Sequence, residues 1–272
     1  MAAPARTRRR AAGPAIQQSP SQASSDLILA FAALELQLSE VAQQGLAGEQ
    51  LDTVLGRRRV QRQSRLLIDT FRRDYRERLS DLLESAYGSG ARLAGARPRG
   101  AIQRAAMAQL VGGTSQRLDF ALDTVGRQVD DIFRKAGLEH AARQLSRELP
   151  EEAAVGLMRR DLEERGVTGF VDRRGARWTL SNYARMALTT TTSEAANRGV
   201  ADAVKATGRD LVRVSDHHCK HHPSDPTNPC RVFEGKMLSL TGRTPGVPVL
   251  LTLPPWHPFC EHNLAPAPEG AR

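Results

Sequence analysis

The feature that most constrains the fold is a spacing of apolar residues by threes and fours that recurs from residue 26 to residue 165. This spacing places apolar side chains on one face of an α-helix. The chain is also rich in alanine, leucine and arginine and contains only 4% aromatic residues, which favours helix. The pattern therefore predicts an all-helical body over residues 26–165. Its clearest stripes are Leu27, Phe31, Leu34, Leu38 and Val41, and Leu118, Leu122, Val125, Val129 and Ile132.

Glycines suggest where the helices of this body end. One helix is expected from Asp52 to Tyr87, ended by Gly88 and Gly90, and another is expected to close near Gly137. Two shorter helices should follow, up to residue 165.

From Gly166 onward the pattern changes to short runs. The stretch "VTGFVDRRGARWTL" predicts a β-hairpin, and the following helix is expected to stop at Gly208. "RDLVRVSD" reads as a strand, "RVFEGKMLSLTG" as a second hairpin turning at Glu234-Gly235, and "VPVLLTLPP" as a last extended run.

The sequence thus predicts an α+β fold that is mainly α, with a long-helix body followed by a small, hairpin-rich C-terminal domain. We divide it into a disordered basic arm (1–25), the helical body (26–165), a hairpin plus Thr/Ala-rich helix (166–208) and a small C-terminal domain (209–272).

Charge and composition bear on the partners. The formal charge of +9 favours a polyanionic partner, nucleic acid first. The N-terminus has no apolar core of a secretory signal, and no apolar run approaches the ~18–20 residues of a membrane span. Three cysteines favour a reducing compartment. The candidate nucleic-acid contacts are Arg8, Arg9, Arg10, Arg57, Arg58 and Arg59.

Every cysteine and six of the seven histidines gather in the C-terminal stretch. Zinc takes about four nitrogen or sulfur donors, so Cys219, Cys230, Cys260 and one histidine predict a Cys₃His site. His257 is favoured over His262, because a two-residue gap to Cys260 is a more usual chelating step than a one-residue gap. The alternative is a set of buried thiols and surface histidines without metal.

A catalytic interpretation stays open beside the structural one. A zinc-dependent nuclease would suit the positive charge, with Asp216, Asp225 or Glu234 as its base. Thiolates in three positions favour a closed, structural site instead. A third hypothesis is a DNA-binding module that uses the arginine-rich arm and helix, with affinity that falls steeply with salt.

Several motifs in one order resemble a known family. "VTGFVDRRGARWTLSNYARMALTTTTSEAANRG", "DLVRVSDHHC", "CRVFEGKMLSLTG" and "HPFCEHNLAP" are similar to tailed-phage minor capsid proteins of the Mu F-like head morphogenesis group. The resemblance covers residues 165–266 and implies a structural component of the virion, present in several copies, that is made in the host cytoplasm.

It also implies association with the portal, the major capsid protein or the inner face of the head, with DNA contact during packaging or ejection. By position it assigns Cys219, Cys230, His257 and Cys260 as zinc ligands, and Gly235 as a hairpin glycine.

Overall fold

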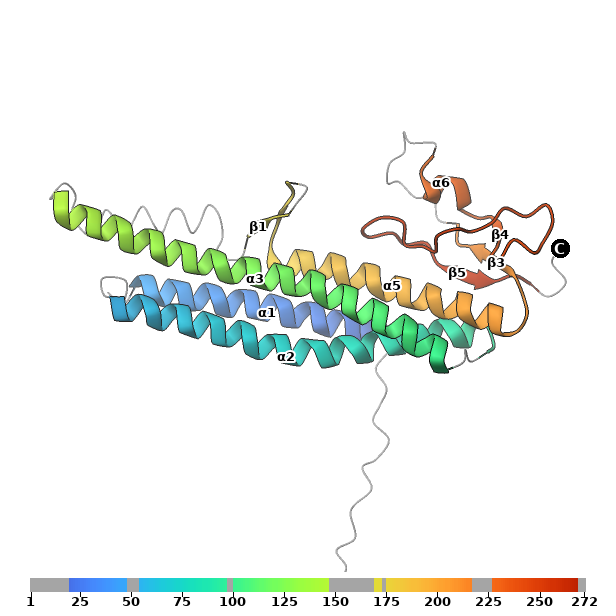
Figure 1. Ribbon diagram of the computed structural model, residues 1–272, viewed down its shortest axis with the longest axis horizontal. Helices are drawn as coiled ribbons and strands as arrows, with labels where there is room; N and C mark the ends of the chain where they lie inside the picture. Colours follow the sequence, from blue (N-terminus) through green and yellow to red (C-terminus); the bar gives the residue numbers. More distant parts are fainter. Residues whose placement is uncertain are drawn as a thin grey trace, which may run out of the picture.

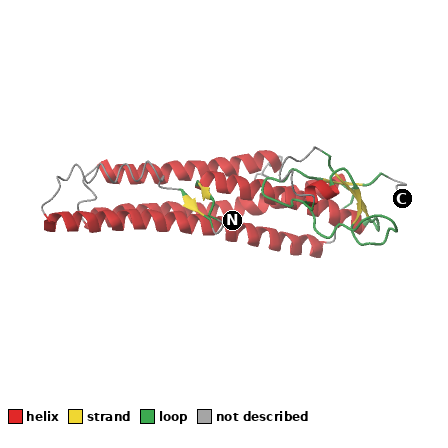
Figure 2. Ribbon diagram, turned by 90° about the horizontal axis from the view of Figure 1, so that it is seen from above, coloured by secondary structure: helices red, strands yellow, loops and turns green. Residues whose placement is uncertain are grey.

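The protein is described by a computed structural model that covers residues 20–47, 54–96, 100–146, 169–172, 175–216 and 227–268. Four long helices of the described chain run along one axis, and a small sheet lies at one end of the rod that they form (Figure 1 and Figure 2). This arrangement confirms the predicted mainly helical α+β class. The long helices are α1 (Pro20–Ala47), α2 (Val54–Leu93), α3 (Gly100–Ser146) and α5 (Leu180–Ala206).

The predicted apolar stripes form the bundle core. Phe31 of α1 is fully buried and meets Phe71 and Tyr75 of α2, with ring centroids 4.6 Å and 5.5 Å away. Leu118 and Leu122 of α3 are likewise fully buried in the same cluster. The 3.6-residue period thus identified the buried faces correctly.

An ion-pair ladder fixes the antiparallel register of α2 against α3. Arg76 pairs with Asp119 at 2.5 Å. In two further pairs the residue numbers fall along α2 while they rise along α3. These are Arg72–Asp123 and Arg65–Asp130. Asp119 also accepts a hydrogen bond from the Tyr75 hydroxyl (2.7 Å), so the ladder is tied to the aromatic core.

Gly88 and Gly90 do not end α2, which continues to Leu93; that prediction was wrong. The physical reason is a close crossing with α5. A Cβ on Gly90 would lie 1.9 Å from the Ala196 carbonyl oxygen, and a Cβ on Gly199 would lie 2.0 Å from the Tyr87 oxygen. The glycines let two backbones touch, which helix-terminating rules do not anticipate.

Other helix ends differ as well. α3 passes through Gly137 and reaches Ser146, so the expected stop at this glycine was wrong. α1 begins at Pro20, six residues before the expected Asp26. The second of the two short helices expected before residue 165 lies outside the described residues.

The first hairpin is confirmed. β1 (Phe170–Val171) pairs antiparallel with β2 (Arg177–Trp178), and the Trp178 indole donates to the Asp172 carboxylate (2.9 Å). α5 follows, and the chain leaves it at Gly208, whose φ of +77° suits glycine. α5 packs against α1, α2 and α3, so the core is continuous across residue 165.

The C-terminal sheet has β3 (Leu211–Val214) at its centre, antiparallel to β4 (Met237–Ser239) on one side and β5 (Leu264–Pro266) on the other. The predicted second hairpin was wrong: its first arm is the short helix α6 (Pro229–Phe233), which turns at Gly235 (φ +70°) into β4. β5 was not predicted. The sheet packs on the C-terminal half of α5 through a shared apolar cluster.

Candidate metal centre

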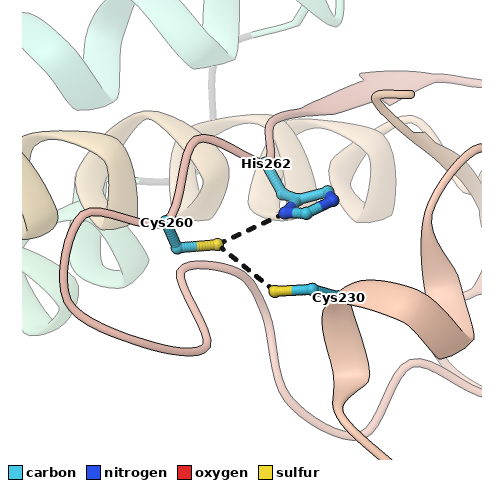
Figure 3. Close-up of side chains that lie close together, drawn as sticks. All are labelled: Cys230, Cys260 and His262. Atoms are coloured by element: carbon cyan, nitrogen blue, oxygen red, sulfur yellow. Dashed lines mark hydrogen bonds between the residues drawn. The ribbon is translucent and has the colours of Figure 1, made fainter. Parts of the chain in front are cut away.

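Three potential metal donors meet beside the sheet. The Cys230 and Cys260 sulfurs lie 3.9 Å apart, and the Cys260 sulfur lies 3.4 Å from Nδ1 of His262 (Figure 3). All three donor atoms lie within 4.8 Å of one another. The side chains are at most 3% exposed. A buried cluster of two thiols and an imidazole is a chemically suitable donor set for a metal ion.

Cys230 is positioned by the start of α6. Asn228 caps this helix, its side-chain oxygen accepting from the Cys230 amide at 2.9 Å, and Pro229 occupies the first helical position. Proline there has no amide that needs a partner, and its φ is already helical. The local sequence N-P-C therefore fixes the backbone that presents the Cys230 thiol.

Cys260 and His262 come from the segment that leads into β5. The Cys260 amide donates to the His257 carbonyl (3.1 Å), which closes a turn through Phe259 at a φ of +59°. From there buried and exposed residues alternate strictly: Cys260, His262 and Leu264 point inward, while Glu261 faces solvent. An extended backbone places residues two apart on the same side, which brings both donors to the cluster.

α5 holds this segment in place through one buried side chain. The Asn197 amide nitrogen donates to the carbonyls of Pro254 (3.1 Å) and His262 (3.0 Å), and its oxygen accepts from the Leu264 amide (2.8 Å). Asn197 is 1% exposed. The donor segment is therefore fastened to the helical bundle as well as to the sheet.

The His262 ring is fixed on both sides. It packs against Trp256 with ring centroids 5.3 Å apart, and Trp256 packs against Phe233 of α6. Its Nε2 lies 3.5 Å from a Glu234 carboxylate oxygen, while Nδ1 faces Cys260. A carboxylate behind a histidine is the arrangement that orients histidine ligands in zinc sites.

The distances fit zinc better than a disulfide. Tetrahedral zinc with bonds of about 2.3 Å to sulfur and about 2.0 Å to nitrogen separates two sulfurs by about 3.8 Å, and sulfur from nitrogen by about 3.5 Å. The observed separations are 3.9 Å and 3.4 Å. A disulfide needs about 2.05 Å, and both cysteines are free thiols.

The structure places the predicted ligands as follows. It brings Cys230 and Cys260 together with His262, the histidine ranked second by the sequence analysis. His257 is half-buried, its Nδ1 lies 2.8 Å from the Pro258 carbonyl, and it is not in this group. Cys219 lies outside the described residues. The alternation of buried and exposed residues from Cys260 onward explains why His262, and not His257, reaches the thiols.

The acidic residues proposed as the base of a nuclease do not gather at one described position. Glu234 stands behind His262, Asp216 is exposed beside Gly235, and Asp225 lies outside the described residues. Of the predicted nucleic-acid contacts, Arg8, Arg9 and Arg10 are also outside. Arg57, Arg58 and Arg59 lie on the first turns of α2, where Arg58 and Arg59 are exposed. α2 begins at the end of the rod away from the sheet (Figure 1).

Fold and site together define an elongated, mainly helical protein with a nitrogen–sulfur donor cluster buried beside its terminal sheet. A family model for phage minor capsid protein 2 matches residues 53–248, well over half of the sequence. The chain therefore belongs to this family and is a phage minor capsid protein, which confirms that part of the resemblance seen in the motifs. The match spans the body from α2 onward and ends before Cys260 and His262.

The remaining comparisons add no relative. Neither the curated proteins nor the solved structures contain a match to the chain. Among the helices of the described residues, none combines the length and the apolar character that crossing a membrane requires.

Proposed function

We propose that this minor capsid protein is a structural component of the phage head that joins the portal, the major capsid protein or both, with its C-terminal sheet stapled by one zinc ion. The observation that supports the staple is the buried Cys230–Cys260–His262 cluster with zinc-like separations. Family membership supports the place in the virion, with assembly in the host cytoplasm.

A staple suits this part of the molecule. The three strands have only three or four residues each, and a long loop joins β4 to β5. Small, irregular units gain the most from a metal, because the free energy of binding adds directly to folding. Zinc would be held by Cys230, Cys260 and His262, with Cys219 as the proposed fourth ligand; His257 is the alternative to His262. Donors this deeply buried favour a closed structural site over a catalytic one.

DNA contact is a further part of the proposal. Arg57, Arg58 and Arg59 stand near the N-terminus of α2, and its first turn contains no acidic residue. Cations at this end of a helix oppose the helix dipole, so they add nothing to helix stability. Their position, remote from the sheet, suits a phosphate-contacting end of the rod that faces packaged DNA.

Metal content tests the staple directly. The full chain, purified without a histidine tag in zinc-containing buffer, should contain about one zinc per chain. Cys230→Ser and His262→Ala should lose it and unfold at lower temperature, while the matched control His257→Ala should keep it. A zinc-free wild type would refute the staple. Loss of zinc in His257→Ala but not in His262→Ala would identify His257 as the histidine ligand, as the sequence analysis expected.

The place in the head needs a separate experiment. Cross-linking mass spectrometry of assembled virions should detect cross-links between lysines of this chain and the portal or major capsid protein. Particles should also lose the protein when the Cys230→Ser chain replaces the wild type. Metal-dependent cleavage of DNA by the purified chain, abolished by Asp216→Ala with the fold intact, would support the nuclease instead.

A further inference from the structure

The outer face of α1 is more apolar than is usual for a helix face that is exposed to solvent. Directly opposite the buried stripe lie Leu29, Ala33 and Leu36, and both leucines are 65% exposed. Glu40 lies on the same face one turn after Leu36. It is the only charged residue of the stripe Leu29, Ala33, Leu36 and Glu40. A free helix face normally carries several charges, so a continuous Leu–Ala–Leu stripe indicates a covered surface.

The outer face of α2 presents a different stripe. Leu55 and Leu66 are exposed by 75% and 65%, and Arg62 and Arg73 lie on the same face. The two helices also differ in charge. α1 has acidic residues and no arginine or lysine, whereas α2 has five arginines and no acid between Val54 and Ile68.

The two stripes lie at the same heights along the rod. Phe31 of α1 meets Phe71 of α2, and ten residues later Val41 clusters with Val60. Halfway between these contacts, Leu36 is level with Leu66. By the same count Glu40 is level with Arg62, so leucine faces leucine and acid faces base at matching heights.

We propose that a second copy of this chain covers the α1 stripe with its α2 stripe, the two rods lying parallel without axial shift. Leu36 of one copy then meets Leu66 of the next, and Glu40 meets Arg62. Because the two surfaces differ, the pair still offers one free α1 stripe on one copy and one free α2 stripe on the other. Such a contact generates a closed ring where the rotation closes and an open array where it does not. The inference does not depend on the metal.

The test uses sedimentation of the full chain in reducing buffer with zinc, over a concentration series. The wild type should self-associate, and Leu36→Asp or Leu66→Asp should weaken this roughly tenfold or more. The matched control is Leu93→Asp, which changes a leucine of similar exposure, 61%, elsewhere on α2 and should have no effect. Helix content by circular dichroism and zinc content should stay constant in all three.

A charge swap tests the pairing itself. Glu40→Lys and Arg62→Glu should each weaken association, and the double variant should recover it, because every contact contains one residue of each kind. A monomeric wild type at all concentrations would overturn the proposal. So would equal effects of Leu36→Asp and Leu93→Asp, or Leu36→Asp abolishing only incorporation next to another head protein while self-association persists.

Discussion

The helical bundle and the C-terminal sheet reach stability by different means. The bundle buries apolar stripes along helices of 27 to 47 residues, with aromatic contacts and an arginine–aspartate ladder added to them. The sheet has three short strands, and hydrogen bonds from single polar side chains hold the segments around it. Asn197 holds the donor segment and Asp210 holds a loop. Many weak, periodic contacts tolerate individual losses, whereas a few specific ones do not. Substitutions should therefore be more damaging per atom in the sheet.

The largest effect is expected at the joint between the two regions. Asn197→Ala would leave the Pro254 and His262 carbonyls and the Leu264 amide without their buried partner, at a cost of about 3–5 kcal/mol. Chemical denaturation should show this as early loss of the sheet while the helical signal remains. Asn263→Ala, which removes an exposed amide, is the control and should cost under about 1 kcal/mol. Equal costs would mean that α5 does not anchor the sheet.

The second effect lies within the bundle, where backbones touch. Gly199→Ala puts a methyl group into the space of the Tyr87 carbonyl, so α2 and α5 must separate, at a cost of about 3 kcal/mol. Gly112 of α3 is also helical but has nothing within 4 Å of its Cβ position. Gly112→Ala should therefore stabilise the protein by roughly 0.5–1 kcal/mol, through helix propensity. Thermal unfolding of both variants gives the comparison, and a stable Gly199→Ala would contradict the close crossing.

The glycines of the long helices also show how much of the fold could be predicted from the sequence. The stripe through Leu27 and Phe31 identified a buried face because helical periodicity is local information. Nothing local distinguishes Gly199, which lies against another helix, from Gly137, which α3 simply passes through. A glycine that ends a helix and one that admits a neighbour look alike until the partner helix is known.

In the candidate site, too, some ligands could be predicted from the sequence and others could not. Cys230 and Cys260 were identified because cysteines are scarce and gathered in one region. The histidine was ranked by chain spacing alone, which favoured His257 over His262. What brings His262 to the thiols is an extended segment whose residues alternate between core and solvent up to Leu264. That alternation depends on β5 pairing with β3, a long-range contact that no local motif announces.

The smallest expected effect tests the polar fixing of the sheet through pH. Partial burial by itself would raise the pKa of Asp210, but hydrogen bonds from the hydroxyls of Ser239 (2.5 Å), Thr241 (2.6 Å) and Thr244 (2.9 Å) outweigh it and lower the pKa to about 2. Since the pKa is lower in the folded protein than the ordinary value of 3.8, the stabilisation is complete above pH 3.8 and is lost as the pH falls toward 2. Solvent screening limits it to about 1 kcal/mol.

Other carboxylates titrate over the same range, so the measurement is a difference between variants. The free energy of unfolding of the wild type should exceed that of Asp210→Asn at pH 6, and the gap should close between pH 4 and pH 2 because the protonated aspartate resembles the amide. Asp74→Asn, at an exposed position on α2, should track the wild type throughout. A gap that stays constant down to pH 2 would mean that the loop is held by the shape of Asp210 and not by its charge. Single polar contacts would then contribute less to the sheet than its comparison with the bundle implies.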